Sequence, residues 1–247
     1  MKRDKWVWWE WAALACLALA GAVVLAGCGT RETLSPLSPS ASGAIVAPAA
    51  ARPVLLAIDG NSLTQARNGA QAMPAALLDV LGHPANVTLV DAGQSGHSTA
   101  DMLLSAPGLL DGLPKPGQVN LLIVWEGGND LYFGASVDLA FEHLRTYCLA
   151  RRAAGYQIVL LTVPPRANEL DPPTWDRDAL ALNARLRAES GAWVDALVDV
   201  GADPVMGDPA APLAGVYYSP LDHVHLTDAG AQRVAQLVAP IVLRLMH

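Results

Sequence analysis

The feature that most constrains the fold is an alternation of short apolar runs with longer helical patterns, which starts at Pro53 and continues to the end of the chain. The apolar runs predict five strands, at residues 54–58, 87–91, 119–125, 156–163 and 193–198. The other patterns predict helices at residues 70–81, 99–104, 136–154, 177–189 and 227–246. Runs that are apolar throughout are typical of parallel strands covered on both faces. We therefore expect an α/β fold with three layers, in which a parallel five-stranded sheet lies between helices.

The first 27 residues have the composition of a membrane-directed segment. A net-basic start is followed by an apolar stretch, residues 6–27, which only Glu10 interrupts. Residues 25–28 read Leu-Ala-Gly-Cys, and small residues of this kind precede the cleavage site of a signal peptide. This segment resembles a bacterial lipoprotein signal, which implies cleavage before Cys28 and attachment of lipid to its sulfur. An uncleaved transmembrane anchor is the alternative, because 22 residues can span a bilayer.

The rest of the chain divides into a tether and one domain. Residues 28–52 are rich in Ser, Pro and Ala, and such a segment buries too little apolar surface to fold, so we expect a disordered tether. Residues 53–247 are numerous enough for one domain with its own core. The lipoprotein resemblance implies a membrane-anchored protein of the bacterial cell envelope. Gly29, rather than Asp, follows the cysteine, which favours the outer membrane over the inner one.

The net charge of the chain limits which partners it can bind. Without residues 1–27, the chain carries 13 basic and 21 acidic side chains, a net charge of −8. A surface of this sign disfavours nucleic acid as a partner, because phosphates are also negative. Cys16 and Cys28 precede the domain, which leaves Cys148 as its one cysteine and excludes a disulfide framework. Nothing in the sequence indicates an oligomeric state.

The first predicted strand leads into a candidate nucleophile. Its apolar residues end in Asp-Gly-Asn-Ser-Leu at 59–63, where Gly60 lets the chain turn and Ser62 follows the strand. In open α/β sheets, ligands bind at the carboxyl ends of the strands. Ser62 is therefore a candidate for nucleophilic chemistry. Taken alone, the same residues also fit the start of a helix with Ser62 as its cap.

Two further strand ends carry residues that can hold an anion. Residues 91–99 form a glycine-rich loop before a predicted helix, and such a loop can present backbone N–H groups to an anion. Residues 125–130 read Trp-Glu-Gly-Gly-Asn-Asp, where paired glycines allow close approach and Asn129 offers an amide donor. An ordinary turn and a helix cap by Asn129 or Asp130 are the respective alternatives.

A candidate base lies just before the last predicted helix. Asp222 and His225 are three residues apart in a loop, so the carboxylate can hold one imidazole nitrogen while the other faces a site. A serine nucleophile needs this arrangement of base and orienting group. A metal bound by His223 and His225 is the alternative, but no further cluster of histidine or acidic residues completes a ligand set. We expect neither a metal nor a cofactor.

Together, these stretches resemble the blocks of the SGNH (GDSL-type) hydrolases, a family of esterases and lipases with a flavodoxin-like α/β/α fold. Gly-Asn-Ser-Leu at 60–63 looks like the first block, and the loop that ends in Gly96 looks like the second. Gly-Gly-Asn-Asp at 127–130 is similar to the third, and Asp-x-x-His at 222–225 to the last. The blocks occur in the family's order and extend over nearly all of the predicted domain.

The resemblance implies a role for each matching residue. Ser62 would be the nucleophile, His225 the general base and acid, and Asp222 the partner that orients His225. The oxyanion would be held by the backbone N–H groups of Ser62 and Gly96 and by the side-chain amide of Asn129. One departure is visible, because Asn61 stands where the family usually has Asp. This change removes a charge and puts the fine tuning of the site in doubt.

A rival serine lies in the second block. Gly-His-Ser-Thr-Ala at 96–100 resembles the Gly-x-Ser-x-Gly elbow of α/β-hydrolases, which implies Ser98 as the nucleophile. Against this, Ala100 replaces the final glycine. Those enzymes also take their acid and histidine from separate loops, whereas here both lie within residues 222–225. We therefore favour Ser62.

The resemblance leaves the substrate open. Related proteins cleave acetyl groups from sugars, short-chain esters, thioesters or lysophospholipids, and we expect a small-molecule ester with a short or acetyl acyl group. Residues 164–175 and 205–220 are rich in Pro, Gly and Ala and are expected to form the rim of the site. An alternative of another class is a silent module that binds carbohydrate or a protein partner. The complete set of site residues counts against it.

Overall fold

A computed structural model describes residues 51–65 and 69–247. The predicted signal peptide, Cys28 and almost all of the predicted tether lie outside the described residues. Within the described ranges, no helix is both long and apolar enough to cross a membrane.

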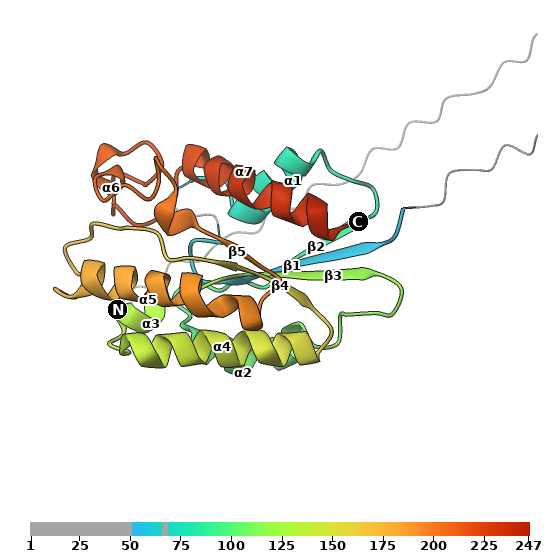
Figure 1. Cartoon of the computed structure of the whole chain (residues 1–247). Helices are drawn as coiled ribbons and strands as arrows, with labels where there is room; N and C mark the ends of the chain where they lie inside the picture. The colour runs from blue at the N-terminus through green and yellow to red at the C-terminus, as the bar shows by residue number, and fades with distance from the viewer. Residues whose placement is uncertain (1–50, 66–68) are drawn as a thin grey trace, which may run out of the picture. The chain divides into compact units, whose positions relative to one another are not determined.

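The core of the fold is a sheet of five parallel strands in the order β2-β1-β3-β4-β5 (Figure 1). The strands are β1 Val54–Gly60, β2 Val87–Asp91, β3 Val119–Trp125, β4 Gln157–Leu161 and β5 Ala196–Val198. This order is the flavodoxin-like one, in which the chain winds outward in both directions from the boundary between β1 and β3. The predicted fold class is confirmed.

Helices cover both faces of the sheet, as Figure 1 shows. One face carries α1 (Met73–Leu81) and α7 (Asp228–Leu245), and the other carries α2 (Thr99–Leu109), α4 (Val137–Ala153) and α5 (Trp175–Glu189). Successive residues of a strand point to opposite faces. Leu56 therefore packs in the core under α1 and α7, whereas Leu55 packs in the core under α2, α4 and α5. Burial of β1 on both faces explains its continuous apolar sequence.

Several elements differ from the sequence prediction. Strand β5 is shorter than predicted because Trp193 and Val194 pack into the core from the turn before it, without joining the ladder. Helix α2 extends past the predicted end at residue 104 and contains Pro107 near its end, where proline cannot donate the helical hydrogen bond. The structure also contains two short helices that the sequence did not predict, α3 (Gly128–Tyr132) and α6 (Ala211–Ala214).

The topology places two of the predicted site stretches side by side. Strands β1 and β3 pair directly, with Gly60 opposite Trp125, so the loops that follow them meet at the topological switch point. Gly60 is required there because a Cβ would lie 2.5 Å from the carbonyl oxygen of Trp125. The carboxyl end of β1 can therefore approach β3 only with glycine at this position.

Candidate active site

The turn that carries Ser62 is fixed by the side chain of Asn61. Asn61 is buried, and its Oδ1 accepts a hydrogen bond of 2.8 Å from the backbone N–H of Leu63. The buried Thr64 closes the turn, because its hydroxyl donates to the carbonyl oxygen of Asn61 at 2.8 Å. Asn and Asp side chains both stabilise turns of this kind. Asn61 therefore keeps the turn-forming acceptor that an aspartate would supply.

Ser62, His225 and Asp222 form one chain of hydrogen bonds. Ser62 Oγ lies 2.8 Å from His225 Nε2, and His225 Nδ1 lies 2.8 Å from Asp222 Oδ2. Asp222 Oδ1 accepts a hydrogen bond of 2.9 Å from the backbone N–H of His225. With its proton on Nδ1, the imidazole donates to Asp222 and can accept the proton of Ser62. Asp222 and His225 share one turn, which directly precedes α7.

The loops after β2 and β3 bring Gly96 and Asn129 to the same hollow. Ser62, Gly96, Asn129 and His225 all line a hollow of about 250 Å³. Gly96 has φ +83°, a conformation that favours glycine. The Asn129 amide donates to the carbonyl oxygen of His97 at 2.7 Å, which fixes its orientation and leaves a second N–H to donate elsewhere. These are the positions predicted for oxyanion donors.

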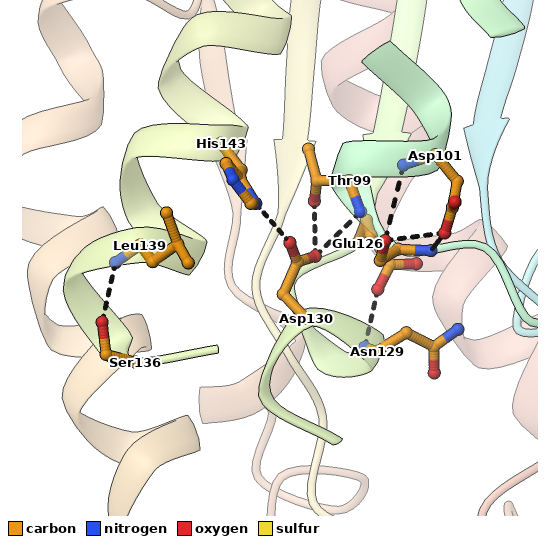
Figure 2. A network of polar contacts seen from close by, with 9 residues as sticks. Thr99, Asp101, Glu126, Asn129, Asp130, Ser136, Leu139 and His143 are labelled. Carbon is orange, nitrogen blue, oxygen red and sulfur yellow. Dashed lines mark hydrogen bonds and ion pairs between the residues drawn. The ribbon is translucent and has the colours of Figure 1, made fainter. Parts of the chain in front are cut away.

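Asp130 ties the second predicted block to the third, as Figure 2 shows. Its Oδ2 accepts hydrogen bonds from the backbone N–H and the hydroxyl of Thr99, at 2.9 and 2.7 Å. Its Oδ1 lies 2.9 Å from Nδ1 of His143 on α4. The carboxylate is buried, so these bonds are shielded from water. Asp130 thus holds the start of α2 against α3, and with it the loop that contains Gly96.

Glu126 is a buried carboxyl group behind Asn129, and sequence reasoning missed it. Its Oε1 accepts a hydrogen bond of 2.7 Å from the backbone N–H of Asn129 (Figure 2). Burial raises the pKa of Glu126 well above its usual value, and the charge of Asp130 raises it further. Hydrogen bonds from the Asn129 N–H and the Asn61 side chain lower the pKa by less. Glu126 therefore fixes the backbone of Asn129 from the interior of the protein. Burial was the missing signal, because the sequence alone gives no reason for a carboxyl group to lie inside the protein.

A second buried carboxyl group lies on β1, just before the Ser62 turn. Asp59 is 2% exposed, accepts the Gly60 N–H at 2.9 Å and accepts a short hydrogen bond from the Tyr147 hydroxyl. Burial raises the pKa of Asp59 to about 6, although the hydrogen bonds from Tyr147 and Gly60 act in the opposite direction. Asp59 thus anchors the end of β1 to α4.

The rival serine and the candidate metal ligand have structural partners. Ser98 caps α2, because its side chain and that of Asp101 form a capping box. His223 lies with Nδ1 3.0 Å from the carbonyl oxygen of Pro212. Among residues 51–65 and 69–247, no group of three or more His, Cys, Asp and Glu side chains is placed to hold a metal ion.

One of the two predicted rim segments lies at the site. From residues 164–175, Arg166 lines the hollows at Ser62, and its guanidinium stacks 3.7 Å from the Trp175 ring while pairing with Asp171. From residues 205–220, none lines a hollow that contains Ser62, but Gly207 and Pro209 line a neighbouring hollow that shares Trp175 with the site. This segment instead packs beside α7, where the Tyr218 hydroxyl donates to the carbonyl oxygen of Met206.

Comparison with known proteins identifies the family. Residues 59–233 match the model of the GDSL-like lipase/acylhydrolase family. The chain belongs to this family. The matched residues contain all four predicted blocks, so this acylhydrolase is an ester hydrolase of SGNH type. Among curated protein sequences, none matches the chain.

Solved structures share the fold of this acylhydrolase. A GDSL-like lipase from Bacteroides thetaiotaomicron is 19% identical, with a TM-score of 0.61 over 77% of this chain and 88% of that one. A member of the lipolytic protein G-D-S-L family from Veillonella parvula is 14% identical, with a TM-score of 0.61 over 77% and 99%. An acetyl xylan esterase is 19% identical, with a TM-score of 0.58 over 76% and 99%. At these identities the likeness establishes the architecture.

Proposed function

We propose that this acylhydrolase is a serine esterase that cleaves carboxylic esters with short acyl groups, acetyl above all, through an acyl-enzyme intermediate. The hydrogen-bonded chain Ser62–His225–Asp222 is the observation that carries the proposal. The oxygen of a serine is a weak nucleophile unless an adjacent base accepts its proton. Here the base is 2.8 Å away, and the base is itself oriented by a carboxylate.

The reaction follows from this geometry in two halves. Ser62 Oγ attacks the carbonyl carbon of the ester while its proton passes to His225 Nε2. The bond between that carbon and the alcohol oxygen then breaks, and His225 gives the proton to the departing alcohol. In the second half, water attacks the acyl-enzyme and loses a proton to His225. Ser62 recovers its proton as the carboxylic acid leaves.

The negative oxygen of each tetrahedral intermediate needs donors. We assign this role to the backbone N–H groups of Ser62 and Gly96 and to the second N–H of the Asn129 amide. Donors that are already oriented need no rearrangement when the charge appears, and each contributes about 3 kcal/mol in acyl transfer. Asn129 meets this condition, because its hydrogen bond to His97 holds the amide in place without substrate.

The experiment is to label the purified protein with a fluorophosphonate and to locate the label by peptide mass spectrometry. We expect the label on Ser62, and we expect Ser62→Ala to abolish both labelling and ester turnover while the domain stays folded. Ser98→Ala is the matched control and should keep most of the activity, because Ser98 caps a helix. A label on Ser98 would overturn the proposal, and a folded wild-type protein that takes no label would favour a silent binding module.

We further propose that the enzyme acts in the bacterial cell envelope, anchored through lipid on Cys28. The support is the Leu-Ala-Gly-Cys stretch at 25–28 after an apolar segment. Cys28→Ser should release the protein from membranes or leave an uncleaved precursor, as judged by fractionation and by mass. A variant that is processed and membrane-bound like the wild type would refute the lipid anchor.

A further inference from the structure

Two hollows meet at Ser62, and they differ in size and lining. The outer hollow, of about 250 Å³, is lined by Ser62 together with Gly96, Phe133, Asn168, Leu170 and His225, among others. The inner pocket, of about 30 Å³, is lined by Ser62 together with Gly128, Val163, Pro164, Pro165 and Trp175, among others. The outer hollow thus contains the base, whereas the inner pocket is mostly apolar and does not include His225; the two share Ser62, Asn129, Arg166 and Val224.

On the proposed function, the reaction indicates which hollow holds the alcohol part of the ester and which holds the acyl part. His225 must reach the alcohol oxygen to protonate it as it departs. Because His225 lines the outer hollow and not the inner pocket, the alcohol belongs in the outer hollow. The carbonyl oxygen faces the donors of Gly96 and Asn129. The inner pocket is then left for the acyl chain.

The inner pocket has room for a very short chain. A water-sized group needs about 10–15 Å³ of such volume, so a pocket of about 30 Å³ holds about two methyl-sized groups. Trp175 forms its wall and is itself only 4% exposed. A Cβ on Gly128 would lie 3.5 Å from Cη2 of the Trp175 ring, which shows how closely this wall approaches.

Behind this wall lies a third hollow, of about 290 Å³. It shares Val163, Pro164, Pro165 and Trp175 with the inner pocket and continues past Ala179 and Leu180 of α5. Trp175 therefore separates a small space beside the nucleophile from a much larger, mainly apolar one.

We propose that Trp175 determines the acyl specificity of this enzyme. With the indole in place, acetyl and propionyl esters fit the inner pocket and longer acyl chains are excluded. Without the indole, the inner pocket joins the rear hollow, and medium-length acyl chains enter. The Trp175 Nε1 makes no hydrogen bond within the described part of the protein, so a smaller apolar residue removes packing and the stacking with Arg166 but no hydrogen bond.

The test compares kcat/KM for p-nitrophenyl acetate, butyrate and octanoate, with the rate of Ser62→Ala subtracted. For the wild type we expect acetate to exceed octanoate by at least about 10-fold. Trp175→Leu should raise the octanoate-to-acetate ratio by at least about 10-fold. The matched control is Phe133→Ala, an aromatic residue of the outer hollow, which should leave that ratio unchanged.

A second variant tests the pocket from the opposite side and does not depend on the folding of Trp175→Leu. The Cβ of Gly128→Ala fits at 3.5 Å from Trp175 and 3.7 Å from Val163, so it fills the inner pocket without a clash. With p-nitrophenyl propionate added to the series, we expect propionate to fall relative to acetate.

The results of these assays distinguish failure of the specificity proposal from failure of the proposed function. Equal wild-type use of octanoate and acetate would overturn the specificity proposal and leave the esterase standing. Unchanged ratios in a folded Trp175→Leu and in Gly128→Ala would do the same. A wild-type protein that hydrolyses no ester would instead overturn the proposed function.

Discussion

The buried carboxyl group of Asp59 makes the stability of this enzyme depend on pH in a way that one substitution can isolate. Burial raises the pKa of Asp59 from 3.8 to about 6. At about 1.36 kcal/mol for each pKa unit, this rise corresponds to about 3 kcal/mol of unfolding free energy. Asp59→Asn keeps the size and polarity of the side chain and removes the titration.

The sign follows from which state binds the proton more tightly. Below about pH 4, Asp59 is protonated in the folded and the unfolded chain, and its contribution to stability is fully present. As pH rises through about 6, that contribution is lost, because the unfolded chain ionises first and the folded chain must then hold a buried charge. Relative to the wild type, the unfolding free energy of Asp59→Asn should therefore rise by about 2–3 kcal/mol between pH 4 and pH 8.

Urea denaturation of both proteins at several pH values measures this difference directly. Taking the difference between the two proteins cancels the titration of all other groups. A flat difference for Asp59→Asn would refute the argument that burial controls this carboxyl group.

Three further predictions concern the site and its support. Asn129→Ala should lower kcat by about 10²- to 10³-fold with little change in KM; a loss confined to KM would reduce Asn129 to a binding group. Asp222→Asn should lower kcat by about 10³- to 10⁴-fold, because an amide cannot accept from both the backbone and Nδ1 of His225; full activity would exclude Asp222 as the orienting group. Gly60→Ala should destabilise the domain by about 1–3 kcal/mol through its clash with the Trp125 carbonyl; an unchanged melting temperature would contradict that contact.

The sheet was predictable because its strands are buried on both faces. Strands β2 and β3 begin and end where the apolar runs do. The prediction failed for residues that are buried without being part of a strand. Trp193 and Val194 are apolar because they fill the core, but they do not belong to β5. The short helix α3 has too few residues for a periodic pattern.

The site likewise contains residues that the sequence predicted and residues that it did not. Ser62 and Asn129 were identified from motifs at strand ends and His225 from a motif before the last helix, because the residue types themselves indicate the chemistry. Glu126 was missed as a site residue, and Trp175 was predicted only as the last residue of a rim segment, because their roles depend on which side chains from other elements lie against them. No pattern within residues 125–130 indicates that Glu126 is buried, and no pattern around Trp175 indicates a wall between two hollows.

The position of the Asp222–His225 turn at the start of α7 has a consequence for the way activity is lost. The two residues are joined by local bonds, whereas contact with Ser62 depends on the docking of the C-terminal helix against the sheet. Helix α7 buries one face against the sheet, and this packing keeps the base beside the nucleophile. Any opening that lifts the helix off the sheet therefore separates base from nucleophile, even where the strands stay paired. Because the turn can survive this opening, activity should return as soon as the helix docks again.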